Sequence, residues 1–158
     1  MGAKAPLRIA IAGLGNMGTQ HVQTVASLKR FELAGICDAD QGCLERAGAF
    51  TTAPRYREYG TMLDRETPDA VLIATPHYDH PGMAIEAFRR GMHVLVEKPV
   101  GVHGLDVRRS IAAHEAARAK HPGLVFAAMF NLRTYGQWKK IKSLIDEGEL
   151  GRLVRATW

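Results

Sequence analysis

The sequence predicts an α/β protein built on a doubly wound parallel sheet. Short apolar runs with β-type residues, such as Leu7–Ala12 (LRIAIA), residues 70–74 (AVLIA) and His93–Val96 (HVLV), alternate with helical segments. Continuous apolar runs of this kind are typical of parallel strands that are buried on both faces. The first run leads directly into a glycine-rich turn at residues 13–18 and then into a helix, which is the start of a βαβ unit.

The remaining elements follow the same alternation. Met17, His21, Val25 and Leu28 recur at helical spacing after the glycine turn. Gly91 ends one helical segment, and the Pro-Gly pair at 122–123 marks a turn. We expect strands at residues 7–12, 32–37, 54–56, 70–74, 93–96, 124–129 and 153–158, and helices at residues 17–29, 41–49, 58–65, 81–90, 105–120 and 135–147.

The pattern predicts two domains. Residues 1–129 form the doubly wound domain, and residues 130–158 supply the first helix and strand of a second α/β domain. A strand at 153–158 has nothing after it to pair with, so we expect most of that second domain to be missing.

Composition narrows the class of protein. The 158 residues are 46% hydrophobic and 23% charged, which suits a folded domain with an ordinary core. No apolar run approaches the roughly 20 residues of a membrane helix, and no signal-peptide pattern opens the chain, so no membrane partner and a cytoplasmic location are expected. Cys37 and Cys43 lack zinc-ligand spacing, and both are expected as reduced thiols.

The net charge of +5 raises the question of nucleic acid binding. The basic pairs at 89–90, 108–109 and 139–140 fall on three separate predicted helices, with no stripe of aromatic residues between them. We therefore interpret them as solvated helix faces and expect no nucleic acid partner.

The glycine turn has the context of a dinucleotide-binding fingerprint. Gly13, Gly15 and Gly18 form GxGxxG between a strand and a helix. The first glycine permits a tight turn, the second lets the backbone approach a pyrophosphate, and the third allows close packing of helix on strand. The first helical residues, Asn16 and Met17, place free N–H groups at the positive end of the helix dipole, where phosphates bind.

Asp38 predicts the choice of cofactor. It ends the next strand, 20 residues after Gly18, where a carboxylate accepts hydrogen bonds from the adenosine ribose. Neither Ala39 nor Asp40 is basic, so NAD is favoured over NADP. The alternative is that Asp38 caps the helix that begins near Gln41.

Lys98 is the candidate catalytic acid–base. Glu97 and Lys98 follow a buried strand, and Pro99 ends that strand, so two ionisable groups lie at the edge where α/β sheets bind ligands. Oxidation of an alcohol needs a base for the hydroxyl proton, and a lysine serves where burial or a cation lowers its pKa. The alternative is a surface ion pair between Lys98 and Glu97, and the residue types alone favour neither.

The segment TPHYDH at residues 75–80 leaves the strand at 70–74 on the same edge. Its two histidines and aspartate suggest a metal, but no third and fourth ligand is identifiable from spacing, so no metal site is expected. We interpret His80 as a cofactor neighbour or a helix cap.

Taken together, these motifs resemble the amino-terminal part of the Gfo/Idh/MocA oxidoreductases, the glucose–fructose oxidoreductase and inositol dehydrogenase family, which has a Rossmann NAD(P)-binding fold. The resemblance rests on five segments, from GLGNMG through Cys37-Asp38, ATPHYDH and GMHVLVEKPV to NLR at 131–133, and on the closing GELGRLVRATW. Order and spacing match along the whole chain.

The resemblance implies roles for particular residues. Thr75, Pro76 and His80 line the nicotinamide side, and Glu97 contacts the nicotinamide ribose. Lys98 is the catalytic lysine, often before a cis peptide to proline. Arg133 matches an arginine that faces the active site.

The resemblance also implies hydride transfer between NAD and a hydroxyl or carbonyl carbon of a sugar, cyclitol or related polyol. Family members continue into a larger domain that supplies a catalytic aspartate and histidine and often the oligomer interface. We therefore expect this chain to be inactive alone, and a homo-oligomer only with that domain. A non-catalytic NAD-binding sensor or regulatory module is the alternative.

Overall fold

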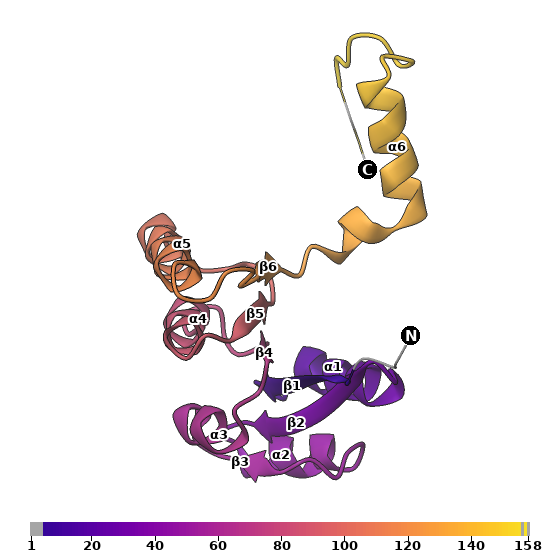
Figure 1. Cartoon of the computed structure of the whole chain (residues 1–158). Coiled ribbons are helices and arrows are strands. Elements are labelled where there is room, and N and C mark those ends of the chain that lie inside the picture. Colours follow the sequence, from indigo (N-terminus) through magenta and orange to yellow (C-terminus); the bar gives the residue numbers. More distant parts are fainter. Residues whose placement is uncertain (1–4, 156, 158) are drawn as a thin grey trace.

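A computed structural model describes residues 5–155 and 157. Six parallel strands form one sheet in the order β3-β2-β1-β4-β5-β6 (Figure 1). The predicted doubly wound fold is therefore confirmed. The strands are β1 (Leu7–Ala12), β2 (Phe31–Cys37), β3 (Arg55–Tyr56), β4 (Ala70–Ile73), β5 (His93–Val96) and β6 (Phe126–Ala128).

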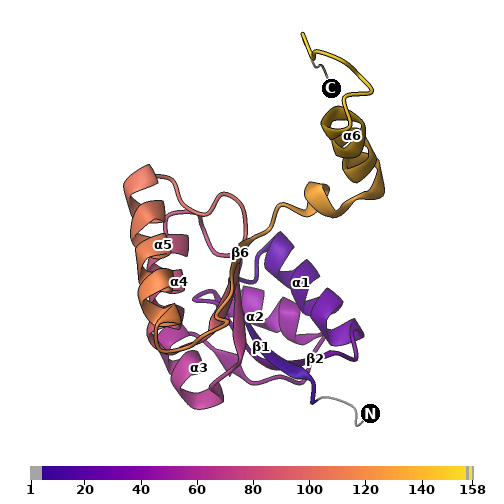
Figure 2. The ribbon, with the colours of Figure 1, turned by 45° about the horizontal axis from the view of Figure 1, so that its top comes forward.

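Helices cover both faces of the sheet. Helices α1 and α2 pack on one face, and α3, α4 and α5 pack on the other, as Figure 2 shows with the sheet between them. The helices are α1 (Asn16–Ser27), α2 (Gln41–Gly48), α3 (Tyr59–Glu66), α4 (His80–Arg89), α5 (Gly104–Arg118) and α6 (Gly136–Asp146), with a 3₁₀ helix η1 at Asn131–Thr134. No helix of the described residues has the length and apolar character of a membrane span.

The two cores follow from the two-residue period of the strands. In β1, Ala10 and Ala12 face the cluster beneath α3, α4 and α5, while Ile11 faces the cluster beneath α1 and α2. All three are buried. Side chains that are buried on both faces explain why these strands appear in the sequence as unbroken apolar runs.

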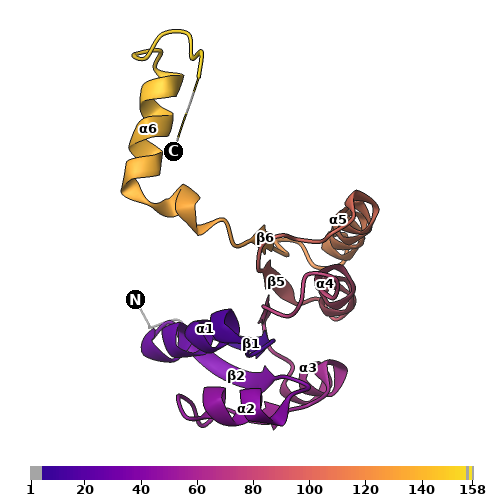
Figure 3. The ribbon, with the colours of Figure 1, turned by 180° about the vertical axis from the view of Figure 1, so that it is seen from behind.

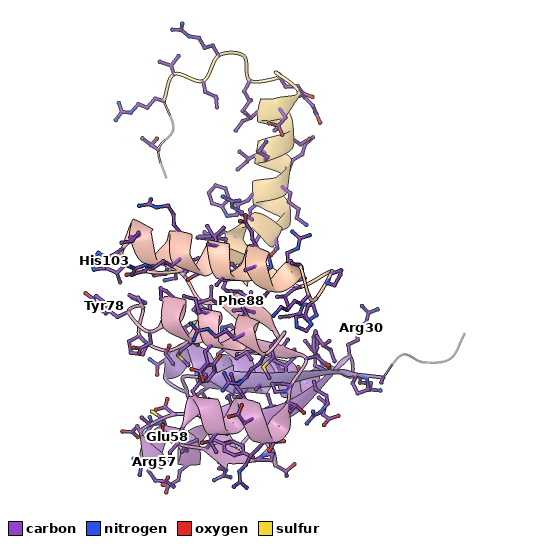
Figure 4. The ribbon with its side chains drawn as sticks, turned by 60° about the vertical axis from the view of Figure 1, so that its left-hand side comes forward. Arg30, Arg57, Glu58, Tyr78, Phe88 and His103 are labelled. Atoms are coloured by element: carbon purple, nitrogen blue, oxygen red, sulfur yellow. The ribbon has the colours of Figure 1, made fainter. Side chains whose placement is uncertain are left out.

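The strand order reverses between β1 and β4. From β1 the chain proceeds outward to β2 and β3, and from β4 it proceeds in the other direction to β5 and β6. Ligands of such sheets bind at this switch point, outside the carboxyl ends of the strands. Figure 4 shows this edge, where Arg57, Tyr78 and His103 follow β3, β4 and β5, with Arg30 at the opposite edge.

The end of the chain differs from the prediction. Residues 153–155 form no strand, although 153–158 was expected to be one, and residues 156 and 158 lie outside the described part. A strand needs a partner for its backbone groups, and none is formed here. Helix α6 stands away from the sheet (Figures 1 and 3), and Trp138, Ile141 and Ile145 on it are exposed.

Candidate cofactor-binding site

The glycine turn leaves the carboxyl end of β1 with the geometry that the fingerprint requires. Gly13 has φ of +85°, and a Cβ there would lie 2.4 Å from the backbone nitrogen of Thr75. A Cβ on Gly18 would lie 1.7 Å from the carbonyl oxygen of Gly13. In contrast, a Cβ on Gly15 would meet nothing within 4 Å. The first and third glycines are thus required by the fold, and the second borders open space where a ligand can approach.

The start of α1 faces the same space. Gly15 is its N-cap residue and makes no side-chain cap, and Asn16 and Met17 are exposed. The N–H groups of the first turn of a helix lack partners within the helix, and they carry the positive end of its dipole. This arrangement suits a pyrophosphate.

Asp38 is held in place across the turn. Its Oδ2 accepts a hydrogen bond of 2.6 Å from the N–H of Leu14, and its Oδ1 accepts one of 2.9 Å from the N–H of Asp40. The alternative role as helix cap is wrong, because Asp40 caps α2 by accepting from the N–H of Cys43. That hydrogen bond lowers the pKa of Asp40. Asp38 therefore keeps acceptor capacity for ribose hydroxyls.

A cavity of about 720 Å³ connects these elements. It extends from the β2 end, with Asp38 and Cys43, past Gly15 to Thr75 and Pro76 after β4. Burial, followed by the charge of Asp38, raises the pKa of the Cys43 thiol. Burial likewise raises the pKa of Cys37, at the cavity floor, to about 12. Both thiols are free, as expected.

Arg57 also lines this cavity, although no motif in the sequence points to it. Its guanidinium donates two hydrogen bonds, of 2.9 and 3.3 Å, to the carbonyl oxygen of Ala39. Pairing of β3 with β2 brings it there. Neither of the two residues that follow Asp38 in the chain is basic, but β3 brings the basic side chain of Arg57 to the same cavity as Asp38.

His80 is not among the residues that line the cavity. Its side chain is fully buried, with Nε2 2.8 Å from the carbonyl oxygen of Thr75 and Nδ1 2.8 Å from that of Pro99. Both oxygens only accept hydrogen bonds, so a neutral ring donates to one of them. His80 thus links the loop after β4 to the turn after β5 by backbone contacts, while Thr75 and Pro76 themselves border the cavity.

The Glu97-Lys98 pair lies at the end of β5, next to the switch point. Glu97 is 7% exposed and is joined to His21 rather than to Lys98, so the surface ion pair considered for Lys98 is not among the ion pairs of the described residues. The Lys98 side chain is exposed, and its peptide bond to Pro99 is cis, as the resemblance implies. Neither Glu97 nor Lys98 lines the cavity itself, which ends at the loop after β4.

Arg133 is separated from these residues. It lies in η1 after the last strand, is exposed, and places its guanidinium carbon 5.5 Å from the centre of the Phe130 ring. It is not among the residues that line the cavity. Within residues 5–155 and 157, no group of three or more His, Cys, Asp or Glu side chains is arranged to hold a metal ion.

A larger hollow of about 920 Å³ lies at the opposite edge, between Phe31 at the start of β2 and Phe50 after α2. It contains no glycine turn and no helix N-terminus. The chemistry of the cofactor edge is absent there, so size alone does not identify the site.

Comparison with known proteins agrees with this geometry. The sequence profile described as "Oxidoreductase family, NAD-binding Rossmann fold" (GFO_IDH_MocA) matches residues 7–128, which is most of the chain. The chain belongs to the Gfo/Idh/MocA oxidoreductase family. The matched region begins at β1 and ends at β6, so it contains every strand of the sheet.

Several Gfo/Idh/MocA relatives are dehydrogenases. An inositol 2-dehydrogenase of Leifsonia xyli subsp. xyli is 28% identical over 94% of this chain and 43% of its own length. The crystal structure of myo-inositol 2-dehydrogenase from Lactobacillus plantarum has a TM-score of 0.85 at 31% identity, over 94% of this chain and 43% of that one. The WlbA dehydrogenase of Bordetella pertussis, solved with NADH and UDP-GlcNAcA, has a TM-score of 0.84 at 30% identity, over 93% and 44%.

These matches bear on the predicted cofactor and on how much of a full-length relative the chain covers. The family is described as NAD-binding, in agreement with the predicted cofactor. The chain spans less than half the length of the relatives that it matches. The residues present fit a dinucleotide, because the open position at Gly15 lies between the Asp38 carboxylate and the loop at Thr75 along one cavity.

Proposed function

We propose that this chain binds NAD along the carboxyl edge of its sheet and serves as the cofactor-binding part of a dehydrogenase. The reaction is hydride transfer between the nicotinamide and a hydroxyl or carbonyl carbon of a sugar, cyclitol or related polyol. The observation that carries the proposal is that the glycine turn, Asp38 and Glu97-Lys98 follow β1, β2 and β5, and so lie at the carboxyl ends of strands on one edge of the sheet.

Each end of the cofactor has its own residues in this proposal. Asp38 accepts hydrogen bonds from the hydroxyls of the adenosine ribose and disfavours a 2′-phosphate by charge. The backbone at Gly13, Gly15 and Gly18 and the first turn of α1, with Asn16 and Met17, bind the pyrophosphate. Thr75 and Pro76 border the nicotinamide side, which His80 supports from behind.

The bound cofactor supplies the hydride acceptor or donor. Lys98 holds or takes the proton of the substrate hydroxyl at Nζ, and Glu97 binds the nicotinamide ribose beside it. The exposure of the Lys98 side chain leaves its Nζ accessible to a substrate. We assign Arg133 to the substrate side, a role that requires η1 to lie against the site.

We also propose that residues 1–129 are one folding unit and that residues 130–158 begin a second domain. The sheet and both of its cores lie before residue 129, and α6 has no buried residue. The exposed apolar residues of α6 support this division, because an amphipathic helix is stabilised mainly by packing of that face.

The experiment is a dehydrogenase assay on the full translated product of the gene, with NAD and a panel of inositols, sugars and nucleotide sugars. Lys98→Ala is expected to lower kcat by about 10²–10⁴-fold, the usual contribution of an acid–base group. NAD binding should stay within about threefold, because Lys98 does not line the cavity. Unchanged turnover in Lys98→Ala would refute the acid–base assignment, and NAD binding without turnover on any substrate would favour a sensor.

A further inference from the structure

His21 makes a contact that neither the fingerprint nor the proposed chemistry requires. It lies on α1, one turn after the glycine loop, and its Nε2 is 2.8 Å from Oε1 of Glu97 at the end of β5. The two side chains are only 13% and 9% exposed. The contact therefore joins the helix that carries the phosphate site to the residue expected on the nicotinamide ribose.

The chemistry of the pair fixes the direction of this hydrogen bond. A carboxylate only accepts, so Nε2 carries the hydrogen and His21 donates. The Nε2–H is present both in the corresponding neutral tautomer and in the imidazolium. The contact therefore persists whether or not Nδ1 is protonated, and His21 acts as a constant donor.

The Glu97 carboxylate can accept further hydrogen bonds besides the one from His21. The Glu97 carboxylate has about four lone-pair sites. Nε2 of His21 uses one at Oε1, and the backbone N–H of Lys98 uses one at Oε2, at 3.1 Å. Each oxygen keeps one free site, and the two oxygens lie on one rigid group that is anchored at both ends. Two free acceptor sites, one on each carboxylate oxygen, match the two vicinal hydroxyls of a ribose.

We propose that His21 is a positioning residue for the nicotinamide half of the cofactor. It orients the Glu97 carboxylate so that both oxygens meet the hydroxyls of the nicotinamide ribose, and it has no contact with the cofactor itself. This inference rests on the proposed function, since it assumes that NAD is the ligand. It also explains why Glu97 tolerates burial, because both of its oxygens already accept a hydrogen bond.

The test compares NAD with ADP, which has the adenosine ribose and the pyrophosphate but no nicotinamide ribose. In the 158-residue chain, His21→Leu is expected to weaken NAD binding about tenfold, the effect of losing one hydrogen bond to a charged group. ADP binding should stay within twofold. His21→Gln restores an amide donor at similar reach, and its NAD affinity is expected within threefold of the wild type.

His114→Leu is the matched control. His114 lies on α5 and its Nε2 contacts the carbonyl oxygen of Leu124 at 3.0 Å, on the far face of the sheet. Its loss is expected to lower the Tm while NAD and ADP affinities stay within twofold. In the Glu97→Ala background, His21→Leu should cause no further loss of NAD affinity.

Three results would overturn the role of His21: NAD affinity unchanged in His21→Leu, equal weakening of NAD and ADP, or no recovery in His21→Gln. If His21→Leu does not fold, His21→Asn removes the contact with a shorter polar side chain and the same expectations apply. Failure of the wild-type chain to bind NAD is a separate result, because it refutes the proposed function before any variant is compared.

Discussion

A methyl group added at Gly15 separates cofactor binding from folding. A Cβ there meets nothing within 4 Å, and the residue has φ of −62° and ψ of −163°, a backbone conformation that alanine adopts. Gly15→Ala is therefore expected to fold normally. The unfolded chain loses some conformational freedom, so stability should rise by about 0.4–1 kcal/mol or stay unchanged.

The same methyl group occupies the space through which a pyrophosphate reaches the backbone. A phosphate oxygen binds an N–H at about 2.9 Å, whereas a methyl carbon needs about 3.5 Å, so the phosphate is displaced. Each hydrogen bond to a charged group contributes about 1.5–3 kcal/mol. Loss of one such bond corresponds to a rise in the NAD dissociation constant of about 10- to 150-fold.

Gly82→Ala is the matched control. Gly82 lies in the first turn of α4, is exposed, and also has open space around its Cβ position. Calorimetric titration with NAD and thermal unfolding by circular dichroism are measured for both variants. Normal NAD affinity in a folded Gly15→Ala protein would refute the placement of the pyrophosphate. A large loss of Tm in that variant would show that the fold does not accommodate a Cβ at Gly15.

The remaining predictions concern Asp38 and Cys37. Asp38→Ala should weaken NAD binding by about 100-fold, because two charge-assisted ribose contacts are lost. It should also reduce the difference in affinity between NAD and NADP, since the repelling charge is gone and Arg57 remains in the same cavity. Asp106→Ala, on α5, is the control for a lost carboxylate, and an Asp38→Ala protein that keeps its NAD affinity would contradict the ribose assignment. Burial raises the pKa of Cys37 from 9.0 to about 12, so folding favours the neutral thiol. That contribution to stability is complete below about pH 9 and is lost as the pH rises toward 12. Urea midpoints should therefore fall less over this window in Cys37→Ala than in the wild type, and parallel curves would count against the shift.

Most of the fold could be predicted because its signals are local. The apolar runs, the glycine turn and the helix periodicity each depend on residues close in the chain, and six of the seven predicted strands are present. The seventh was expected at 153–158; over 153–155, the continuous part that the structure describes, the residue types suit a strand but pair with no other described segment. Pairing depends on the rest of the sheet, which the residue types of one segment do not report.

In the candidate site, too, the residues that are close in the chain were predictable, and those that meet only through the strand order were not. Gly15 and Asp38 lie in one βαβ unit, so their relation was predictable from spacing. Arg57 and His21 were missed because their partners are 18 and 76 residues away and meet them only through the strand order. The burial of His80 was equally out of reach of the sequence pattern, because its Nδ1 meets the carbonyl oxygen of Pro99, 19 residues along the chain.

The most direct test of the account is a calorimetric titration of the 158-residue chain with NAD and, separately, with NADP. The account predicts one NAD per chain and binding of NADP at least tenfold weaker, because the Asp38 carboxylate faces the adenosine ribose. A folded chain that binds no NAD, or one that prefers NADP, would contradict it.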